Sequence, residues 1–311
     1  MTIAVLSGGS SLEREVSLRS GKRVTEALRD RGHDVLPMDL DDQLVQRLSQ
    51  HAIELVFLAL HGKAGEDGSI QSLLDLLGLP YTGSDATASA LAWDKSVSKG
   101  VLRRSGVATP DWHVLSADAV REYGAGRALD RIAEHIAFPL VIKPVQGGAS
   151  LGVRAVEHVD DLAAAIMSAF QYHSAALLER KIIGTEVAVS IVDGVPLPAV
   201  EIQPRGEVYD FAARYTHGAT DFHVPARLDA GVADACATAA LRAWRGLGCR
   251  HVMRADLIVD ADGTPWVLEV DTCPGLTETS LLPLAAQAGG LEFGQLCERV
   301  LEVARTRSLP A

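Results

Sequence analysis

One segment near the C-terminal end constrains the fold most, because it combines two strand-like apolar runs with several charged side chains. It reads RADLIVDADGTPWVLEVDTCPG over residues 254–275. An Asp-Gly pair between two apolar runs is a strong hairpin signal and predicts a two-residue turn at Asp262-Gly263. In that register Ala261 faces Thr264. The segment is therefore expected to be an antiparallel ribbon.

This predicted register gathers the charged side chains on one face of the ribbon. Asp256 is expected opposite Glu269, and Arg254 opposite Asp271. Directly opposed residues share a face, and so do residues i and i+2 of one strand. The other face is predicted to be core and comprises Met253, Ala255, Leu257, Val259, Trp266, Leu268 and Val270.

Three carboxylates and one arginine on one face are unfavourable in a low-dielectric setting unless another cation lies among them. A divalent cation held by Asp256, Glu269 and Asp271 satisfies this condition. Oxygen ligands without histidine or thiol favour magnesium or manganese over zinc. A solvated charged face on an edge hairpin is the alternative.

Composition narrows the function classes. The chain has 311 residues, enough for two or three domains, and its net charge of −11 argues against nucleic acid or an anionic membrane as partner. The four cysteines show no CxxC pair and are expected to be reduced thiols of a cytoplasmic protein. No apolar run reaches 18 residues, so we expect neither secretion nor a membrane span.

Strand and helix patterns alternate over the first 84 residues, which predicts an open parallel sheet with ligands at the carboxyl ends of its strands. A long helix is expected over residues 87–106. From about residue 181 the pattern becomes antiparallel, with a second Asp-Gly hairpin at residues 193–194. Residues 206–222 are predicted to form a long polar loop of the lid type.

Lys143 lies inside an apolar strand and must find an anion or leave its charge buried. The glycine loop at residues 147–150 follows it and offers backbone N–H groups to phosphate oxygens. Together with Lys95, Lys143 is predicted to flank a polyphosphate; a structural lysine that extends its ammonium to solvent is the alternative. Glu179 and Glu186 bracket a strand end suited to adenine and ribose hydroxyls.

Two residues have both structural and chemical interpretations. Ser10-x-x-Glu13 fits a capping box at the first helix, and equally a carboxylate that receives a substrate ammonium group. Cys273 lies beside the acidic cluster, but no histidine is close in sequence, so we do not favour a nucleophile there.

The order of these motifs resembles the D-alanine:D-alanine ligases of the ATP-grasp superfamily over essentially the whole chain. The motifs are GGSSLEREVSLRSG, ALHGKAGEDGSIQ, LPYTGS, DKSVSK, VIKPVQGGASLGV, LERKIIGTEV, YDFAARY, RADLIV and LEVDTCPGLTETSLLP. The resemblance implies an α/β, three-domain ATP-grasp fold in which two α+β domains clasp ATP. The implied domains are residues 1–84, 85–180 and 181–311.

The resemblance also implies residue roles. The implied ATP ligands are Lys95, Lys143, Glu179, Arg180, Lys181, Ile182, Glu186 and Arg214. Two magnesium ions are implied at Asp256, Glu269 and Asp271, with manganese as a substitute. The implied D-alanine ligands are Glu13, His61, Ser280 and Leu281, and the implied catalytic group is Glu13, Ser150, Tyr215, Arg254 and Gly275. ATP converts one carboxylate to an acyl phosphate, which the second amino group attacks.

Four positions depart from the usual family pattern: Ala149 replaces a serine, Arg214 a lysine, Asp271 an asparagine and Thr279 a histidine. Tyr215 matches the dipeptide-forming members and favours an amine as second substrate. A related ligase with a different acceptor in a secondary pathway remains an alternative, as does a nucleotide-binding protein without catalysis. The family further implies a homodimer.

Overall fold

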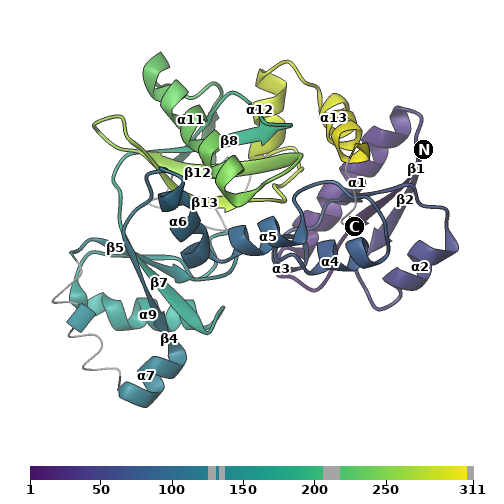
Figure 1. Cartoon of the computed structure of the whole chain (residues 1–311). Helices are drawn as coiled ribbons and strands as arrows, with labels where there is room; N and C mark the ends of the chain where they lie inside the picture. Colours follow the sequence, from purple (N-terminus) through teal and green to yellow (C-terminus); the bar gives the residue numbers. More distant parts are fainter. Residues whose placement is uncertain (125–130, 133–136, 206–217, 307–311) are drawn as a thin grey trace.

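The computed structural model describes residues 1–124, 131–132, 137–205 and 218–306, and Figure 1 shows three sheets with their helices. The first sheet is parallel, in the order β2-β1-β3, and confirms the prediction. Its strands are β1 (Thr2–Ser7), β2 (Asp34–Asp39) and β3 (Leu55–Leu58). The helices α1 (Arg14–Asp30) and α2 (Leu44–Gln50) follow the first two strands.

Both faces of this sheet are buried, which explains its continuous apolar strands. Ile3 and Val5 of β1 belong to one core cluster, and Ala4 and Leu6 to another on the opposite face. The first cluster includes residues of α13 (Phe293–Arg305), and α13 lies beside α1 in Figure 1. The C-terminal helix therefore completes the N-terminal core. The division at residue 84 remains a prediction.

The second sheet is antiparallel, in the order β4-β7-β5-β6, so antiparallel pairing begins before residue 181. Its strands are β4 (Trp112–Ser116), β5 (Leu140–Pro144), β6 (Arg154–Val156) and β7 (Ala175–Arg180). Strand β4 was not predicted. The 3-10 turn η1 (Val159–Asp161) and helix α9 (Leu162–Phe170) follow β6, and α9 packs on the sheet, while α7 (Ala117–Tyr123) follows β4.

The predicted long helix over residues 87–106 is wrong, because two helices occupy most of this range. Helix α5 (Ala86–Trp93) ends at Asp94, whose ψ of 103° is not helical, and α6 (Lys95–Arg104) begins directly after it. The Asp94 carboxylate accepts hydrogen bonds from the N–H groups of Ser96 and Val97 and so caps α6. The break places Lys95 at the first turn of a helix. Two short helices, α3 (Lys63–Glu66) and α4 (Ser69–Leu76), precede this pair.

The third sheet is antiparallel, in the order β11-β10-β8-β12-β13, with β9 paired to β8. Its strands are β8 (Thr185–Val192), β9 (Val195–Pro196), β10 (Val200–Pro204), β11 (Thr220–His223), β12 (Val252–Val259) and β13 (Pro265–Asp271). Helices α11 (Ala230–Leu247) and α12 (Leu281–Ala288) pack on it. Residues 220–222 are strand, so the predicted lid loop ends too late; residues 206–217 lie outside the described part.

The hairpin at Asp193-Gly194 is confirmed. Both residues have positive φ values, 53° and 72°, and Val192 pairs with Val195 across a two-residue turn.

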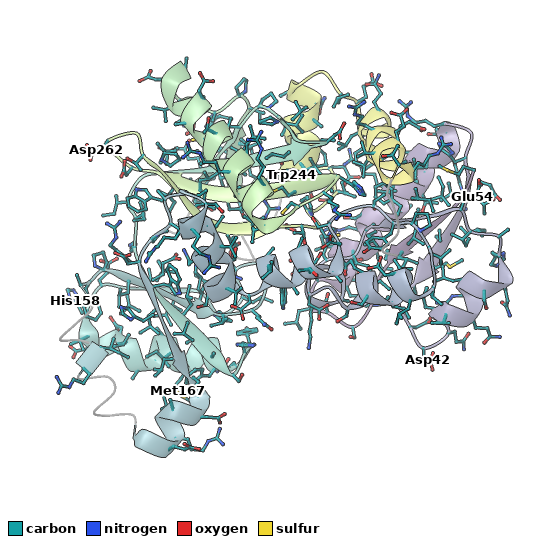
Figure 2. All side chains as sticks on the ribbon, in the orientation of Figure 1. Asp42, Glu54, His158, Met167, Trp244 and Asp262 are labelled. Carbon is teal, nitrogen blue, oxygen red and sulfur yellow. The ribbon has the colours of Figure 1, made fainter. Side chains whose placement is uncertain are left out.

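The β12–β13 hairpin has the predicted register only near its charged end. Arg254 pairs with Asp271 and Asp256 with Glu269, as expected. The predicted two-residue turn is wrong: Asp260 faces Thr264 across a three-residue loop, and the Asp260 N–H donates to the Thr264 carbonyl at 3.1 Å. Asp262 marks the tip of this loop in Figure 2. A β-bulge after Asp256 absorbs the difference of one residue.

The bulge changes which side chains of β13 reach the core. Val267 is fully buried there, whereas Leu268 lines a pocket and the Trp266 indole donates to Asp260 Oδ2 at 2.8 Å. The assignment of Trp266 and Leu268 to the core was therefore wrong. In the described residues, no helix is both long and apolar enough to cross a bilayer.

Candidate active site

Two pockets adjoin between the sheets and share Lys95, Gly147, Gly148 and Glu269 in their walls. The larger has a volume of about 640 Å³ and lies between the second and third sheets. The smaller lies between the N-terminal unit and the β12–β13 hairpin. Most of the residues singled out in the sequence line one of the two.

A buried cluster with excess positive charge lies at the larger pocket. The Lys143 ammonium donates to Glu179 Oε1 at 2.8 Å, and Lys99 contacts the other carboxylate oxygen. Lys99 also donates to Thr109 Oγ1 at 2.7 Å. Burial opposes the charge of Lys143, but Glu179 and Glu269 outweigh it and raise the pKa of Lys143. Two cations thus share one anion.

Lys99 was missed by the sequence analysis, although it is fully buried. Burial lowers its pKa to about 8, against the opposing effect of Glu179. Its sequence signal was available, because Lys99 follows Lys95 by four residues and precedes the buried Leu102 by three, and so lies on the apolar face of α6.

Lys95 links the two pockets. Its ammonium donates to the Gly147 carbonyl at 2.6 Å and lies 3.4 Å from Glu269 Oε2. The glycine loop is thereby tied to the hairpin. Within this loop Ala149 and Ser150 have φ values of 50° and 56°, a left-handed conformation that costs side-chain-bearing residues energy and concentrates at functional sites.

A second buried cluster has excess negative charge. Arg254 donates to Asp256 at 2.6 and 2.8 Å and lies 3.0 Å from Asp271 Oδ2. Burial opposes its charge, but the two aspartates raise the pKa of Arg254 far above its ordinary value. The predicted charged face is therefore confirmed, with Arg254 and Asp256 buried and Glu269 and Asp271 partly exposed.

The reasoning that led to a metal is corrected by these contacts. Each carboxylate already has a protein cation, since Arg254 serves both aspartates and Lys95 serves Glu269. Among the residues that the structure describes, no three His, Cys, Asp or Glu side chains are grouped as a metal site. Charge balance alone does not require a bound ion. The oxygen-only donors still fit magnesium chemistry, and Glu269 lines both pockets.

Glu13 lines the smaller pocket and is buried. The capping-box interpretation was wrong, because α1 begins at Arg14 and Glu13 makes no side-chain cap; Ser11 Oγ instead accepts the Glu13 N–H at 3.2 Å. A side chain at Gly148 would come within 2.4 Å of Glu13 Oε1, so the loop backbone lies directly against this carboxylate.

Glu66 is a second carboxylate of this pocket that the sequence analysis missed. It accepts the Gly62 N–H at 2.7 Å. Burial, Asp271 and Glu13 raise its pKa well above the ordinary value. The sequence pattern that could have indicated Glu66 is the turn motif HGKAGEDG, which follows the carboxyl end of β3.

His61, Gly275, Thr279, Ser280 and Leu281 also line the smaller pocket. His61 is 3% exposed, and both ring nitrogens already have partners in the protein. Burial lowers its pKa. Ser280 Oγ accepts the Thr277 N–H at 3.0 Å, which fixes the turn before α12.

The predicted catalytic residue Ser150 lines the larger pocket, and so do the predicted ATP ligands Arg180, Lys181, Ile182 and Glu186. The Arg180 guanidinium lies 4.7 Å from the Trp266 ring centroid. Arg214 and Tyr215 lie outside the described residues. Cys273 is buried, and burial together with Glu66 raises the pKa of its thiol well above the ordinary value, which disfavours a nucleophilic thiolate.

Comparison with known proteins gives consistent results across the chain. The family model for the D-ala D-ala ligase C-terminus matches residues 101–302, and that for the N-terminus matches residues 42–84. A D-alanine–D-alanine ligase of Anaeromyxobacter sp. (strain K) is 44% identical over 98% of this chain and 97% of its own length. A D-alanine–D-alanine ligase of Gloeobacter violaceus is 45% identical over 97% of this chain and 99% of its own length.

Solved structures agree. A D-alanine–D-alanine ligase of Bacillus anthracis superposes with a TM-score of 0.85 at 36% identity, covering 98% of this chain and 97% of that one. The same ligase complexed with ATP gives 0.84 at 34% identity over the same shares. The D-Ala:D-Ser ligase VanG of Enterococcus faecalis gives 0.83 at 27% identity, covering 98% and 99%. With this fold, this site and relatives above 40% identity over nearly its whole length, the chain belongs to the D-alanine–D-alanine ligase family.

Proposed function

We propose that this protein is an ATP-dependent ligase that joins two D-alanines into D-alanyl-D-alanine for peptidoglycan precursor synthesis. One observation carries the proposal: Lys95 and Glu269 contact each other where the two pockets adjoin, and Glu269 acts electrostatically on Lys143 of the positive cluster and on Arg254 of the negative cluster. Phosphoryl transfer to a carboxylate needs cations at the phosphates and a separate site for the acceptor. The relatives named D-alanine–D-alanine ligase support the choice of substrate.

The larger pocket is the proposed nucleotide site. Lys95 and Lys143 contact the phosphates of ATP. When Lys143 does so, it gives up its hydrogen bond to Glu179, whose Oε1 is then free for another partner. The Arg180–Ile182 backbone and Glu179 contact the adenine, and Glu186 the ribose. The volume of about 640 Å³ is ample for a ligand of this size. Arg214 completes the proposed ATP ligands, whereas Ser150 and Tyr215 belong to the proposed catalytic group.

The smaller pocket is the proposed amino-acid site. Glu13 binds the ammonium of the first D-alanine, and Ser280 with the Leu281 N–H binds the carboxylate of the second. Arg254 and the Gly275 N–H stabilise the oxyanion that forms when the second amine attacks the acyl phosphate. Both lie at the wall of this pocket; Arg254 is buried and Gly275 half-buried, so the donors act in a lower dielectric than bulk water.

Magnesium ions held by Asp256, Glu269 and Asp271 would neutralise phosphate charge during transfer. The all-oxygen donor set supports this assignment. The proposed count of two comes from the family resemblance. Because all three carboxylates now contact Arg254 or Lys95, ion binding requires these contacts to loosen. We further propose that the protein is a homodimer, as the family resemblance implies, and that it is cytoplasmic. ATP as substrate and four buried, unpaired cysteines support the cytoplasm.

The test is phosphate release from ATP and magnesium with each of the common D- and L-amino acids and D-lactate, alone and in pairs. D-Alanine alone is expected to support turnover, with D-alanyl-D-alanine identified by mass. A protein that releases phosphate with another amino acid, or with none, contradicts the proposal.

A different acceptor is the second candidate, and Ala149 and Thr279 favour it because both line the acceptor pocket and depart from the family pattern. The structural similarity to a D-Ala:D-Ser ligase makes D-serine the first acceptor to compare. A mixed dipeptide formed in excess over D-alanyl-D-alanine at equal acceptor concentrations would decide for it.

A further inference from the structure

The loop that carries Gly275 is held against helix α1 by a buried hydrogen-bond chain. His61 Nδ1 lies 3.0 Å from the Cys273 carbonyl, and His61 Nε2 lies 2.8 Å from Ser20 Oγ. Ser20 Oγ accepts the Leu276 N–H at 3.2 Å. The hydrogen-bond chain thus joins α1 and the segment that follows β3 to a loop more than 200 positions away.

Donor and acceptor roles in this chain follow from chemistry. The Cys273 carbonyl accepts only, so Nδ1 carries the hydrogen and donates it. The Ser20 hydroxyl already accepts from Leu276, and its own hydrogen is directed to Nε2 of a neutral imidazole. Burial lowers the pKa of His61 and favours the same neutral form. One tautomer therefore satisfies every group.

The two anchored loop atoms, the Cys273 carbonyl and the Leu276 N–H, bracket Pro274 and Gly275. Arg23 of α1 adds a third anchor, because its guanidinium donates to the Leu276 carbonyl at 2.9 Å and stacks 3.7 Å from the Phe293 ring. A side chain at Gly275 would lie 2.7 Å from Ser280 Oγ. Pro274 fixes its own φ. Little freedom remains for the Gly275 N–H.

We propose that Ser20 and His61 are positioning residues for the ligase reaction, which hold the 273–276 loop so that the Gly275 N–H points at the developing oxyanion. This role replaces direct substrate binding by the His61 ring, whose nitrogens have no capacity left. The inference rests on the proposed function for the identity of the oxyanion, but the hydrogen-bond chain itself does not.

Kinetics of Ser20→Ala, His61→Leu and His61→Gln test the proposal. Ser20→Ala and His61→Leu are expected to lower kcat by about 10- to 100-fold, less than the full loss of an oxyanion donor, while the KM for ATP stays within about twofold. His61→Gln keeps a donor for Cys273 and an acceptor for Ser20, and so retains more of kcat than His61→Leu. The double variant of Ser20→Ala and His61→Leu is expected to match the worse single variant.

Ser89→Ala is the matched control, since Ser89 is equally buried on α5 and its hydroxyl has no hydrogen-bond partner in the described structure. Its kcat is expected to equal that of the unmodified protein. Single losses that multiply in the double variant, or a His61→Gln variant as impaired as His61→Leu with a raised KM for D-alanine, would overturn the positioning role.

A second measurement is independent of activity. Nitrogen-15 NMR of His61 is expected to show the neutral Nδ1–H tautomer at pH 7, and Ser20→Ala is expected to shift the Nε2 resonance. A cationic ring or the Nε2–H tautomer refutes the hydrogen-bond chain even in an active enzyme. If instead the tautomer is as expected but no amino acid supports turnover, the proposed function is refuted while the hydrogen-bond chain is confirmed.

Discussion

The two buried ionic clusters are opposite in charge and also in how the chain builds them. The Lys99–Glu179–Lys143 cluster has two cations on one anion, and its members come from α6, β7 and β5. The Arg254 cluster has one cation on two anions, and its members come from a single hairpin.

Their arrangement relates charge to task. The positive excess lies in the wall of the larger pocket, where phosphates are proposed to bind. The negative cluster borders both pockets, with Arg254 and Asp271 at the smaller one and Asp256 at the larger. Buried ion pairs contribute little net stability, but removing one partner leaves a buried charge and is costly. We therefore expect the free energy of unfolding to fall more when Arg254, the shared cation of the negative cluster, is removed than when Lys99, one of two cations of the positive cluster, is removed.

The largest effect is expected for Arg254→Met, which removes the shared ion of the negative cluster. Asp256 and Asp271 then lose their cation in a buried setting, at a cost of about 3–5 kcal/mol in the free energy of unfolding. Turnover is expected to fall by at least about 100-fold, because an oxyanion donor is lost. Urea denaturation and steady-state kinetics measure the two quantities.

Arg299→Met serves as its control, because Arg299 forms an exposed pair with Asp193 at 2.7 Å. An exposed pair contributes about 0–1 kcal/mol. Equal destabilisation by the two substitutions would contradict the view that burial makes Arg254 indispensable.

The next effect concerns Glu269→Gln, at the contact between the clusters. Its side chain is 28% exposed and lies 3.4 Å from the buried Lys95, which keeps its hydrogen bond to the Gly147 carbonyl, so the loss of stability should be smaller than for Arg254→Met. Turnover is expected to fall at least about 100-fold if Glu269 holds magnesium at the phosphates. Glu298→Gln is the control, since Glu298 is also 28% exposed but pairs with His33. Full activity of Glu269→Gln would refute the metal assignment.

A smaller effect is expected for Lys99→Met, which removes one of the two like ions of the positive cluster. The folded pKa of Lys99 is about 8 and its ordinary value is 10.5, so between these pH values the unfolded chain binds more protons. The free energy of unfolding therefore rises with pH in this window, by at most about 3 kcal/mol in total. Lys99→Met is expected to lose this rise.

Urea titrations at pH 7, 8, 9 and 10 measure the difference between Lys99→Met and the unmodified protein. The exposed Lys22→Met is the control and should leave the alkaline rise in place. A difference that stays constant across the four pH values would show that Glu179 holds Lys99 charged throughout.

The smallest effect is expected for Ala149→Ser, in the loop that Lys95 ties to the hairpin. Ala149 is 8% exposed with a φ of 50°, and serine adds only a hydroxyl. D-Alanine turnover should stay within about threefold or rise, a change of under about 1 kcal/mol in transition-state stabilisation. Product formation with D-alanine measures it, and a loss of more than tenfold would indicate a pocket adapted to another acceptor.

The charged face of the hairpin could be predicted because its residues are close in sequence. A period of two and an antiparallel register place Arg254, Asp256, Glu269 and Asp271 on one face without knowledge of any other element. The same reasoning failed at the turn, since the bulge that moves Val267 into the core depends on packing against α11 and the preceding helices.

The sequence by itself determined the parallel N-terminal sheet, the two hairpins and most pocket residues, because local periodicity and strand ends encode them. Only the tertiary structure decided the partners of the charges. Lys99 meets Glu179, and His61 meets Ser20 and Cys273, across separations from 41 to 212 positions. Such contacts depend on how whole sheets and helices pack, and no pattern along the chain carries that information. The same packing brought the Lys95 ammonium of α6 to Glu269, where the sequence argument had expected only a metal ion besides Arg254.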